Sequence, residues 1–484
     1  MLPLLAARWL PFSDLPEHVA AIAALRQWSD PSYRIAEHYT FAIGESQYLA
    51  YPLAGAALSF VVGTAERANL VLLAATGIAW PYAARSMLRA LRRDERLALF
   101  ACPLFWNHAL VVGLLPFVAS VPLVLLGIAL AVRGRTRAVA ALGALLFFVH
   151  VQALVLFTLI SAARIVALRR PRRSLLALVP GMTTLAAWAL VARVGLRGRS
   201  LDAPGQIRFA APGDLARLFP FWAHDLWKTH ADEALAIAFW ICVSAIALRG
   251  TAKRLALWLP LAVTLVAYVA LPYQIGGGDM LNVRLAVFVP LFVLPVLTPR
   301  RAWPLAGAAV LTVLGAMNDA REIRLAHDEV GDLDRVLDAI PRGSRVLSLH
   351  FRIASQRTHF PSWIHVAAYH RARGGGVAEP SFAVLGHWPL HYRPEAAPPA
   401  KDVDFWEFDP CAFRNAIDGP YYDHVLVRGR IDPFAADPPG PAWTKVLVEK
   451  EWTLFARMPG VTMPATPSTD RGPCSVARGR GPSS

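Results

Sequence analysis

The chain has 484 residues, of which 55% are hydrophobic and only 17% are charged, and its mean hydropathy is +0.40. A soluble chain usually carries about 25% charged residues. Here charge is nearly absent from long stretches and dense in short ones, which is typical of a polytopic membrane protein. The composition therefore excludes a cytosolic enzyme, a disordered chain and a disulfide-stapled secreted domain.

The net charge of +15 is concentrated in short stretches between apolar runs. A basic balance can indicate nucleic-acid binding, but the position of these charges argues against it. Basic residues that flank apolar spans are the anchors of the positive-inside rule, so we expect no nucleic-acid partner. Five such stretches together hold 18 Arg and Lys residues: 85–96, 133–137, 164–173, 249–254 and 300–301.

The apolar runs give the chain its predicted organisation. Residues 1–12 are too short to cross a bilayer, which needs about 20 residues, and they lack the features of a signal peptide. Residues 13–47 are mixed polar and aromatic, with two short helical patterns. Several of the runs that follow are short enough to be tilted, broken or re-entrant. We expect spans near 48–63, 68–86, 96–112, 113–132, 137–149, 150–166, 174–194, 234–249, 253–272, 283–298 and 302–317.

The predicted fold is mainly α, with a polytopic α-helical membrane domain of about 10–12 spans over residues 1–317. A small soluble α/β domain is expected over residues 318–458. Its strand patterns are GSRVLSL at 343–349, DHVLVRG at 423–429 and a hairpin in WTKVLVEKEWTLFARM at 443–458. Residues 459–484 have almost nothing to bury and should be disordered.

The basic stretches also predict the topology. When all five are placed inside, the longest loop (195–233), the glycine-rich loop (273–282) and the soluble domain face outside. The charge pattern does not decide the membrane side of residues 13–47. Two full spans between residues 47 and 85 place residues 13–47 inside, whereas one full span with a half-span places them outside.

The first segment that could carry chemistry is SDLPEH at 13–18, at the start of a helical pattern. An acidic cluster beside the first membrane helix is where a general base can meet a substrate that enters from the aqueous side. The same residues also suit a helix start, because Asp14 is a good N-cap and Glu17 falls three residues later, as in a capping box. Both interpretations stay open.

With this D-x-P-E-H motif near the N-terminus, about ten later spans and a terminal extracytoplasmic α/β domain, the chain resembles the GT-C superfamily. These are polytopic glycosyltransferases that use polyprenyl-phosphate sugars, related to lipid A aminoarabinose transferases and protein O-mannosyltransferases. The resemblance covers the architecture of residues 1–460, and its residue-level anchor is DLPE at 14–17. In that superfamily an acidic residue of the first outer loop acts as base or metal ligand. By this resemblance the role falls on Asp14, with Glu17 as second candidate, and a divalent cation is possible.

The chain departs from the family in one respect. Only 12 residues precede Ser13, where the family has a complete membrane helix. We expect either a start codon assigned too late or a helix that has been lost. An upstream in-frame run of apolar codons would support the first explanation, and an in-frame stop codon immediately upstream would exclude it.

The second candidate site is GGGDMLNVR at 276–284. Glycines allow backbone N–H groups to approach a phosphate, and Arg284, at the rim of a span, is suited to bidentate phosphate binding. We expect Arg284, with Asp279 beside it, to hold the lipid-linked phosphate leaving group. The alternative is an interfacial arginine that reaches toward lipid headgroups.

Polar residues among aromatic ones form a third group of candidates. The outer loop contains His224 and Asp225 within FPFWAHDLWKTH at 219–230, which suits a sugar-binding rim and equally an interfacial aromatic belt. His18 of the first motif and His108, between two apolar runs, complete the candidate substrate-binding set. Residues of the latter kind more often bond to neighbouring helices than line a cavity.

The sequence predicts no metal motif. None of the four cysteines is in CxxC spacing, so no zinc or redox motif is present. The soluble domain is rich in histidine, but the spacing matches neither HExxH nor a zinc finger. We expect this domain to support the fold or recognise an acceptor. Its histidines are His350, His359, His365, His370, His387 and His391.

Three functions remain open. The leading hypothesis is a multi-pass glycosyltransferase of a bacterial inner (plasma) membrane, which moves a sugar from a polyprenyl-phosphate donor to an acceptor on the outer face. Asp14 would act as base and Arg284 would stabilise the leaving phosphate, and a single displacement predicts inversion at the anomeric carbon. The second is a transporter or flippase with a polar path along His108, His150 and Gln152, although the sequence has no internal repeat. The third is a non-catalytic membrane scaffold.

Overall fold

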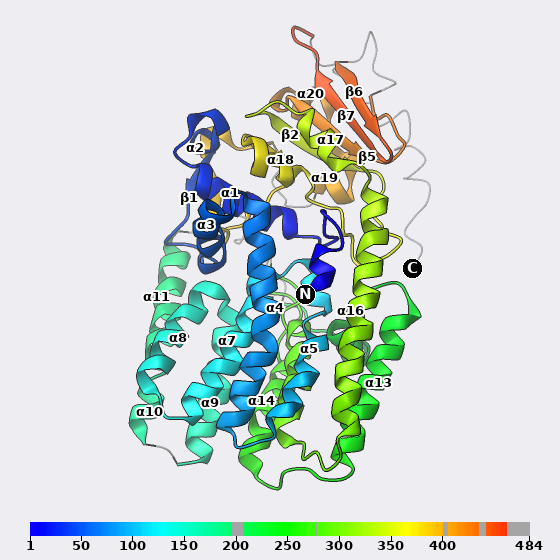
Figure 1. Cartoon of the computed structure of the whole chain (residues 1–484). Coiled ribbons are helices and arrows are strands. Elements are labelled where there is room, and N and C mark those ends of the chain that lie inside the picture. Colours follow the sequence, from blue (N-terminus) through cyan, green and yellow to red (C-terminus); the bar gives the residue numbers. More distant parts are fainter. Residues whose placement is uncertain (170, 196–206, 276–277, 400–404, 435–441, 462–484) are drawn as a thin grey trace.

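The computed structural model describes residues 1–169, 171–195, 207–275, 278–399, 405–434 and 442–461. It is 62% helical, which confirms the expectation of a mainly α fold. The molecule has two layers in Figure 1: a bundle of long helices, and above it a layer of strands and shorter helices. Most of the expected disordered tail lies outside the described residues.

Long helices form the lower layer and run side by side through it (Figure 1). Within it α4 packs on α7, α7 on α8, and α13 on α16. The helices of this layer are α4 Ala65–Ala90, α5 Ala101–Leu104, α6 His108–Val112, α7 Leu115–Val132, α8 Thr136–Val149, α9 Val151–Ala167, α10 Arg172–Leu176, α11 Val179–Gly195, α12 Pro212–His224, α13 His230–Ala247, α14 Leu255–Ala270, α15 Phe288–Val293 and α16 Trp303–Val330.

The helix α12 corrects one expectation, because the sequence predicts a loop over residues 195–233. Pro212 occupies the first turn, where its missing N–H costs nothing. Leu215 and Trp222 are buried, while Asp214 is exposed. This mixed polarity along one helix hides it from a search for apolar runs.

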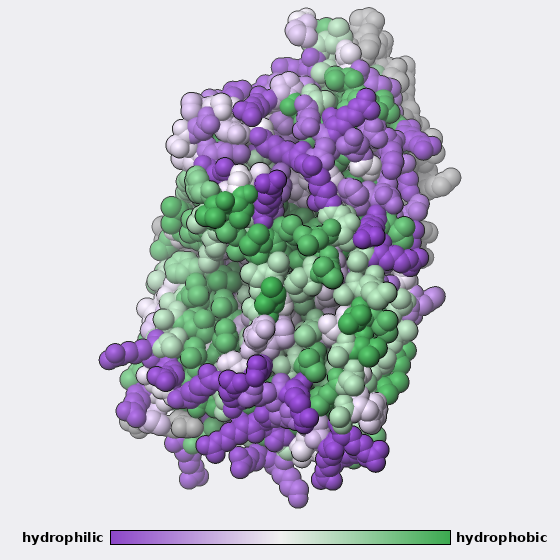
Figure 2. All heavy atoms as spheres, in the orientation of Figure 1, coloured by the Kyte–Doolittle hydropathy of each residue, from purple (hydrophilic) through white to green (hydrophobic). Residues whose placement is uncertain are grey.

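Two described helices, α7 and α13, are long and apolar enough to cross a membrane, or three spans result if α3 (Ala50–Val62) and α4 count as one bent pair. These two helices meet at 114°, so α3 turns away from the direction of α4. Five shorter apolar helices accompany them. Figure 2 shows an apolar band across the visible face of the lower layer, with hydrophilic surface above and below it.

The described residues of the five basic stretches gather at the end of the bundle that lies farthest from the strands (Figures 1 and 2). Arg133 donates to the carbonyl oxygen of Ser86 at 3.2 Å, which joins two of the stretches. Arg93 donates to the carbonyl oxygen of Leu297 at 2.7 Å, close to a third. Loops far apart in sequence thus share one surface, here called the arginine-rich end.

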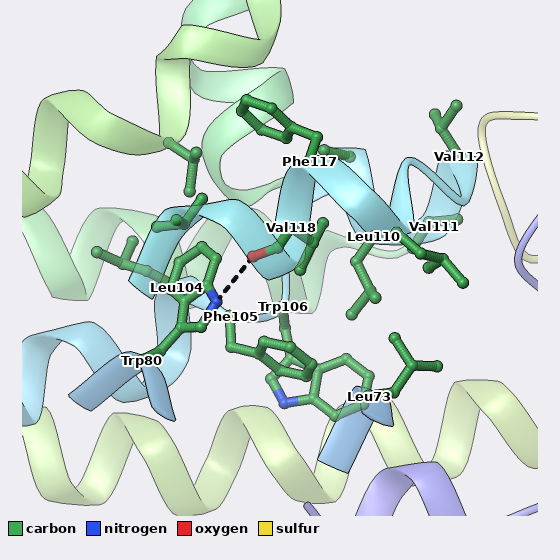
Figure 3. Packing of buried hydrophobic residues seen from close by; sticks show 14 of the residues in the cluster. Leu73, Trp80, Leu104, Phe105, Trp106, Leu110, Val111, Val112, Phe117 and Val118 are labelled. Atoms are coloured by element: carbon green, nitrogen blue, oxygen red, sulfur yellow. Dashed lines mark hydrogen bonds between the residues drawn. The ribbon is translucent and has the colours of Figure 1, made fainter. Parts of the chain in front are cut away.

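A continuous apolar core fills the bundle and fixes residues 104–118, on which the candidate site rests (Figure 3). Trp80 of α4 is fully buried, and its indole N–H donates to the carbonyl oxygen of Val118 at 3.3 Å. Phe105 packs edge to face against Trp80. Because removing a buried tryptophan ring typically costs about 3–5 kcal/mol, these contacts hold this part of the backbone firmly.

The upper layer is built on a five-stranded sheet of order β3-β2-β5-β7-β6. β2 pairs in parallel with β3 and β5, and β7 runs antiparallel to β5 and β6. The predicted strands and hairpin are confirmed. The strands are β1 Tyr39–Phe41, β2 Arg345–His350, β3 Val377–Glu379, β4 Leu390–Tyr392, β5 His424–Arg428, β6 Trp443–Glu449 and β7 Trp452–Arg457. The helices near the sheet are α17 Leu333–Asp338, α18 Ala367–Gly374, α19 Phe405–Phe408 and α20 Asn415–Asp418.

The N-terminal residues also belong to the upper layer, although the sequence groups them with residues 1–317. α1 (Leu15–Gln27) packs against α18. After α2 (Ile35–His38), β1 pairs antiparallel with β4 in a separate two-stranded sheet. The helix α16 runs unbroken across the expected boundary at residue 317. The upper layer is therefore built from both ends of the sequence, and α16 crosses the expected domain boundary. The candidate site lies where the two layers meet.

Candidate active site

Asp14 is fixed at the junction of the two layers by a close backbone contact. The backbone N–H groups of Ser13 and Asp14 donate to the carbonyl oxygens of Val111 and Val112, both at 3.0 Å. Gly113 follows with φ of 93°, and a Cβ there would lie 2.6 Å from the Asp14 nitrogen. Only glycine allows this approach. The helix α6, held by the core in Figure 3, therefore determines where Asp14 sits.

Asp14 occupies the N-cap position of α1, but its carboxylate makes no capping hydrogen bond. Glu17 does not close a capping box either, because its carboxylate is bound to α18 instead. The helix-start interpretation is therefore confirmed for the position of Asp14, since the helix begins at Leu15, but the capping hydrogen bonds that it implies are not formed. The Asp14 side chain is 16% exposed, so it lies close to the surface of the junction without being sealed inside it.

His365, from the upper layer, faces Asp14. Its Nε2 atom lies 3.8 Å from Asp14 Oδ1, and its Nδ1 atom lies 3.1 Å from Glu407 Oε2. The backbone N–H of His365 also donates to Glu407 Oε1 at 2.6 Å. The His365 side chain is 1% exposed and that of Glu407 is fully buried. A buried imidazole thus stands between two carboxylates.

Glu407 is itself held between two histidines. The Nε2 atom of His350 lies 3.7 Å from Glu407 Oε1, and the Ser348 hydroxyl lies 2.7 Å from the same nitrogen. Burial lowers the pKa of His350 to about 4. Burial alone would raise the pKa of Glu407, but the charges of the two histidines and the hydrogen bonds from His365 together lower it. Glu407 thus contacts both His350 and His365.

Glu17, the second candidate for catalysis, forms a buried ion pair with Arg371 of α18 at 2.7 Å. The two side chains are 0% and 1% exposed, and the backbone N–H of Phe382 donates to the same carboxylate at 3.2 Å. This arrangement ties α1 to the upper layer. These contacts are those of a residue that stabilises the fold, and a catalytic role for Glu17 stays a prediction.

His18, on the same helix, is buried between aromatic rings. Its ring centroid lies 5.7 Å from Tyr51 and 5.3 Å from Trp388. Trp388 in turn packs on Phe382 at 5.0 Å, and Phe382 packs on His365 at 5.1 Å. The predicted substrate-binding residue His18 is therefore joined to the Asp14 site by a chain of rings.

Arg284 lies in a short helix, Val283–Val287, at the inner edge of the glycine-rich loop. Its Nη2 atom donates to the backbone carbonyl oxygen of Asp279 at 2.9 Å, and its Nη1 atom lies 3.5 Å from His150 Nε2. The predicted pair of Arg284 and Asp279 is thus in contact, but through the Asp279 backbone. Gly276 and Gly277 lie outside the described residues.

The Arg284 cluster extends toward the upper layer through aromatic rings. His150 packs on Tyr48 at 5.4 Å, and Tyr48 packs on His387 at 5.3 Å. The next residue after His387 is Trp388, which covers His18. The Arg284 cluster and the Asp14 site are therefore parts of one contiguous region.

His108 and Asp225 lie close together in a further group of the predicted residues. His108 Nδ1 lies 3.2 Å from the Asp225 carbonyl oxygen, and Asp225 Oδ1 lies 3.1 Å from His359 Nε2. His224 instead accepts a hydrogen bond from the Trp240 indole at 3.1 Å. An open groove of about 910 Å³ runs past His224 and Asp225, and its lining also includes Pro220, Phe221, Ile237 and Trp240.

Sequence reasoning missed His365 and Glu407. Both come from the last third of the chain, and neither belongs to a spaced motif. The only available signal was a histidine-rich domain that no metal motif explains. Parallel pairing of β2 with β5 and the packing of α18 on α1 bring these side chains to Asp14, and sequence spacing does not reveal such contacts.

Among the described residues, no group of three or more His, Cys, Asp or Glu side chains is arranged to hold a metal ion. No family model, curated protein or solved structure matches the chain. A function for this chain is therefore argued from the geometry of the junction.

Proposed function

We propose that this chain is an integral-membrane glycosyltransferase, which moves a sugar from a polyprenyl-phosphate donor to an acceptor on the outer face of a bacterial plasma membrane. The proposal rests on one observation. The Asp14 carboxylate lies beside a buried histidine, at the start of α1 and away from the arginine-rich end (Figure 1). By the positive-inside rule, the arginine-rich end faces the cytoplasm and the junction faces outward.

In this proposal Asp14 is the general base. It takes the proton from the acceptor hydroxyl as that oxygen attacks the anomeric carbon of the sugar. The new bond joins the acceptor oxygen to the anomeric carbon, and the bond from that carbon to the phosphate oxygen breaks. The electron pair leaves with the polyprenyl phosphate, and the configuration at the anomeric carbon inverts.

Arg284 is the proposed partner of the leaving phosphate. Its guanidinium is oriented by the Asp279 carbonyl oxygen, and a guanidinium held in place in advance stabilises negative charge as it develops. The short helix that carries Arg284 packs against α12. One wall of the apolar groove is formed by α12, and this neighbourhood suits a donor with a long hydrocarbon chain.

Turnover by the purified chain in liposomes tests the proposal. The probes are undecaprenyl phosphates linked to tritiated hexoses, pentoses or amino sugars, with a bacterial envelope extract as acceptor. The wild type should transfer one of these sugars and release undecaprenyl phosphate. Asp14→Asn should lower kcat about 10³-fold, because general base catalysis contributes about 10²–10⁴-fold.

Asp30→Asn is the matched control, since Asp30 is an exposed aspartate of the same N-terminal segment that only caps a short turn. It should turn over as the wild type does. Equal activity of Asp14→Asn and wild type, or no transfer from any donor, would reject the glycosyltransferase proposal. The scaffold and transporter hypotheses would then lead.

The membrane side of the junction can be measured without a substrate. Ser32, in the exposed turn Pro31–Tyr33, is replaced by cysteine and treated with an impermeant maleimide in intact cells. Ser32→Cys should be labelled, whereas Arg135→Cys at the arginine-rich end should react only after lysis. The reverse pattern would place Asp14 on the cytoplasmic side and reject the outer-face reaction.

A further inference from the structure

His365 occupies a position that folding alone does not explain. It is buried, it has a carboxylate at each ring nitrogen, and the two carboxylates come from opposite ends of the chain. Burying a polar ring costs free energy unless its polar atoms find partners. Simple packing in this layer would be served as well by an apolar side chain.

The backbone of His365 is also unusual. Its φ is 59°, in the left-handed region that non-glycine residues rarely adopt. This conformation costs roughly 1–2 kcal/mol for an L-residue, although histidine, asparagine and aspartate enter it more often than others. Strain of this kind is often found where surrounding structure holds a functional side chain in place. Here Glu407 meets His365 twice, by a hydrogen bond from the backbone N–H and by an approach of 3.1 Å to the ring.

We propose that His365 is the positioning residue for Asp14, with Glu407 fixing one ring nitrogen so that the other is directed at the Asp14 carboxylate. This inference rests on the glycosyltransferase function proposed above. It assigns the upper layer a direct part in the reaction, because His365 and Glu407 both belong to it. A base oriented by a second group, which is oriented by a third, is a recurrent arrangement in catalysis.

The distances agree with this role. The 3.8 Å between His365 Nε2 and Asp14 Oδ1 exceeds a hydrogen bond, but contacts of catalytic groups are often long without substrate and shorten when it binds. The contact on the Glu407 side is already short, at 3.1 Å. The ring therefore lies closer to Glu407 than to Asp14.

Two substitutions at one position separate positioning from folding. The amide of glutamine reaches where Nε2 lies and preserves the contact with Asp14, whereas the amide of asparagine reaches where Nδ1 lies and preserves only the contact with Glu407. Asparagine suits a positive φ better than glutamine does. A purely structural role therefore favours His365→Asn, and a positioning role favours His365→Gln.

The experiment measures kcat and KM with the same undecaprenyl-phosphate sugars, in the full chain, at several pH values. His365→Gln should stay within about tenfold of wild-type kcat, while His365→Asn should lose about 10²-fold at an almost unchanged KM, as expected for a base displaced by about 1 Å. His370 is 2% exposed on α18, and His370→Gln and His370→Asn serve as matched controls. These two variants should not differ from each other.

Each outcome decides the inference. Equal kcat for His365→Gln and His365→Asn, whether both are high or both are lost, would overturn it while an inactive Asp14→Asn kept the glycosyltransferase function. The same ratio at positions 365 and 370 would overturn it too, because the effect would then be general packing. If Asp14→Asn is fully active in the same assay, the proposed function fails and His365 has no base to position.

Discussion

The two ends of the molecule use charge in opposite ways. At the arginine-rich end the ion pairs join residues close in sequence and are exposed to solvent. Arg85 and Arg89 pair with Glu95, and the two arginine side chains are 52% and 57% exposed. At the junction Glu17 pairs with Arg371 across most of the chain length, and neither side chain reaches solvent. The ion pairs of the arginine-rich end are therefore exposed, whereas the pair at the junction is buried.

This difference indicates what the charges are for. An exposed pair contributes little to stability, so the arginine-rich end gains mainly a net positive surface, which suits a cytoplasmic membrane face. A buried pair pays a large desolvation cost and is retained where it fixes one arrangement of segments. At the junction that arrangement is α1 against α18, which also sets Asp14 opposite His365.

Breaking the buried pair should give the largest effect on stability. Arg371→Met leaves the Glu17 carboxylate uncompensated in the interior and should destabilise the chain by about 3–5 kcal/mol. The measurement is thermal unfolding of the purified protein in detergent. Replacing both partners, Glu17→Leu with Arg371→Met, should recover much of the lost Tm, because no buried charge is then left alone.

The same variants address the catalytic expectation for Glu17. In the stabilised double variant, turnover should remain measurable if Glu17 is structural. A double variant that regains its Tm but has no turnover would instead make Glu17 part of the reaction.

Much of the upper layer was predictable from sequence, because a strand is indicated by the pattern of a few neighbouring residues. Alternation of apolar residues over 343–349 and 423–429 gives β2 and β5, and the hairpin follows from two such runs around Lys450. The apolar runs of the bundle are equally local. The helix α12 was not predictable in this way, because its apolar residues are interrupted by Asp214 and Arg217.

The candidate site was predictable only in part. Asp14 and Arg284 stand out because acidic and basic residues are rare beside apolar runs. His365 and Glu407 do not stand out in this way, because the sequence around each of them mixes polar and apolar residues. Their role depends on contacts between residues about 350 positions apart, and these arise from packing of the two layers.

The next largest effect, on turnover and not on stability, is expected when Arg284 is replaced. Arg284→Gln should lower kcat/KM about 10²-fold, a loss of about 2.7 kcal/mol in transition-state stabilisation, with the undecaprenyl-phosphate sugars as donors. The control is Arg208→Gln, an exposed arginine on the backbone bridge to Gln274 beside the same loop. Similar losses in both variants would mean that Arg284 contributes only general positive charge.

A smaller, pH-dependent effect is expected at Glu379 in β3, which accepts a hydrogen bond from the Tyr392 hydroxyl. Burial raises the pKa of Glu379 from 4.5 to about 8, so the folded chain holds a proton that the unfolded chain releases. Between these two values stability should fall as the pH rises, by up to about 1.4 kcal/mol per pH unit. Glu379→Gln should flatten the dependence of Tm on pH from 5 to 8.

Glu37→Gln, at a carboxylate that is 55% exposed, should leave that dependence unchanged. If Glu379→Gln keeps the wild-type slope, other titrating groups set the pH response of the junction. The buried carboxyl would then not be protonated in the folded chain at neutral pH.

The smallest effect completes the comparison of the two ends. Arg89→Gln removes the closer partner of Glu95, a contact of 2.6 Å, yet Tm should change by no more than about one degree because exposed ion pairs are screened by water and salt. Thermal unfolding in low and high salt measures this directly. A drop as large as that of Arg371→Met would mean that the arginine-rich end holds the bundle together by its ion pairs. An unchanged Tm would leave its charges as a surface property, in contrast to the buried pair of Glu17 and Arg371 at the junction.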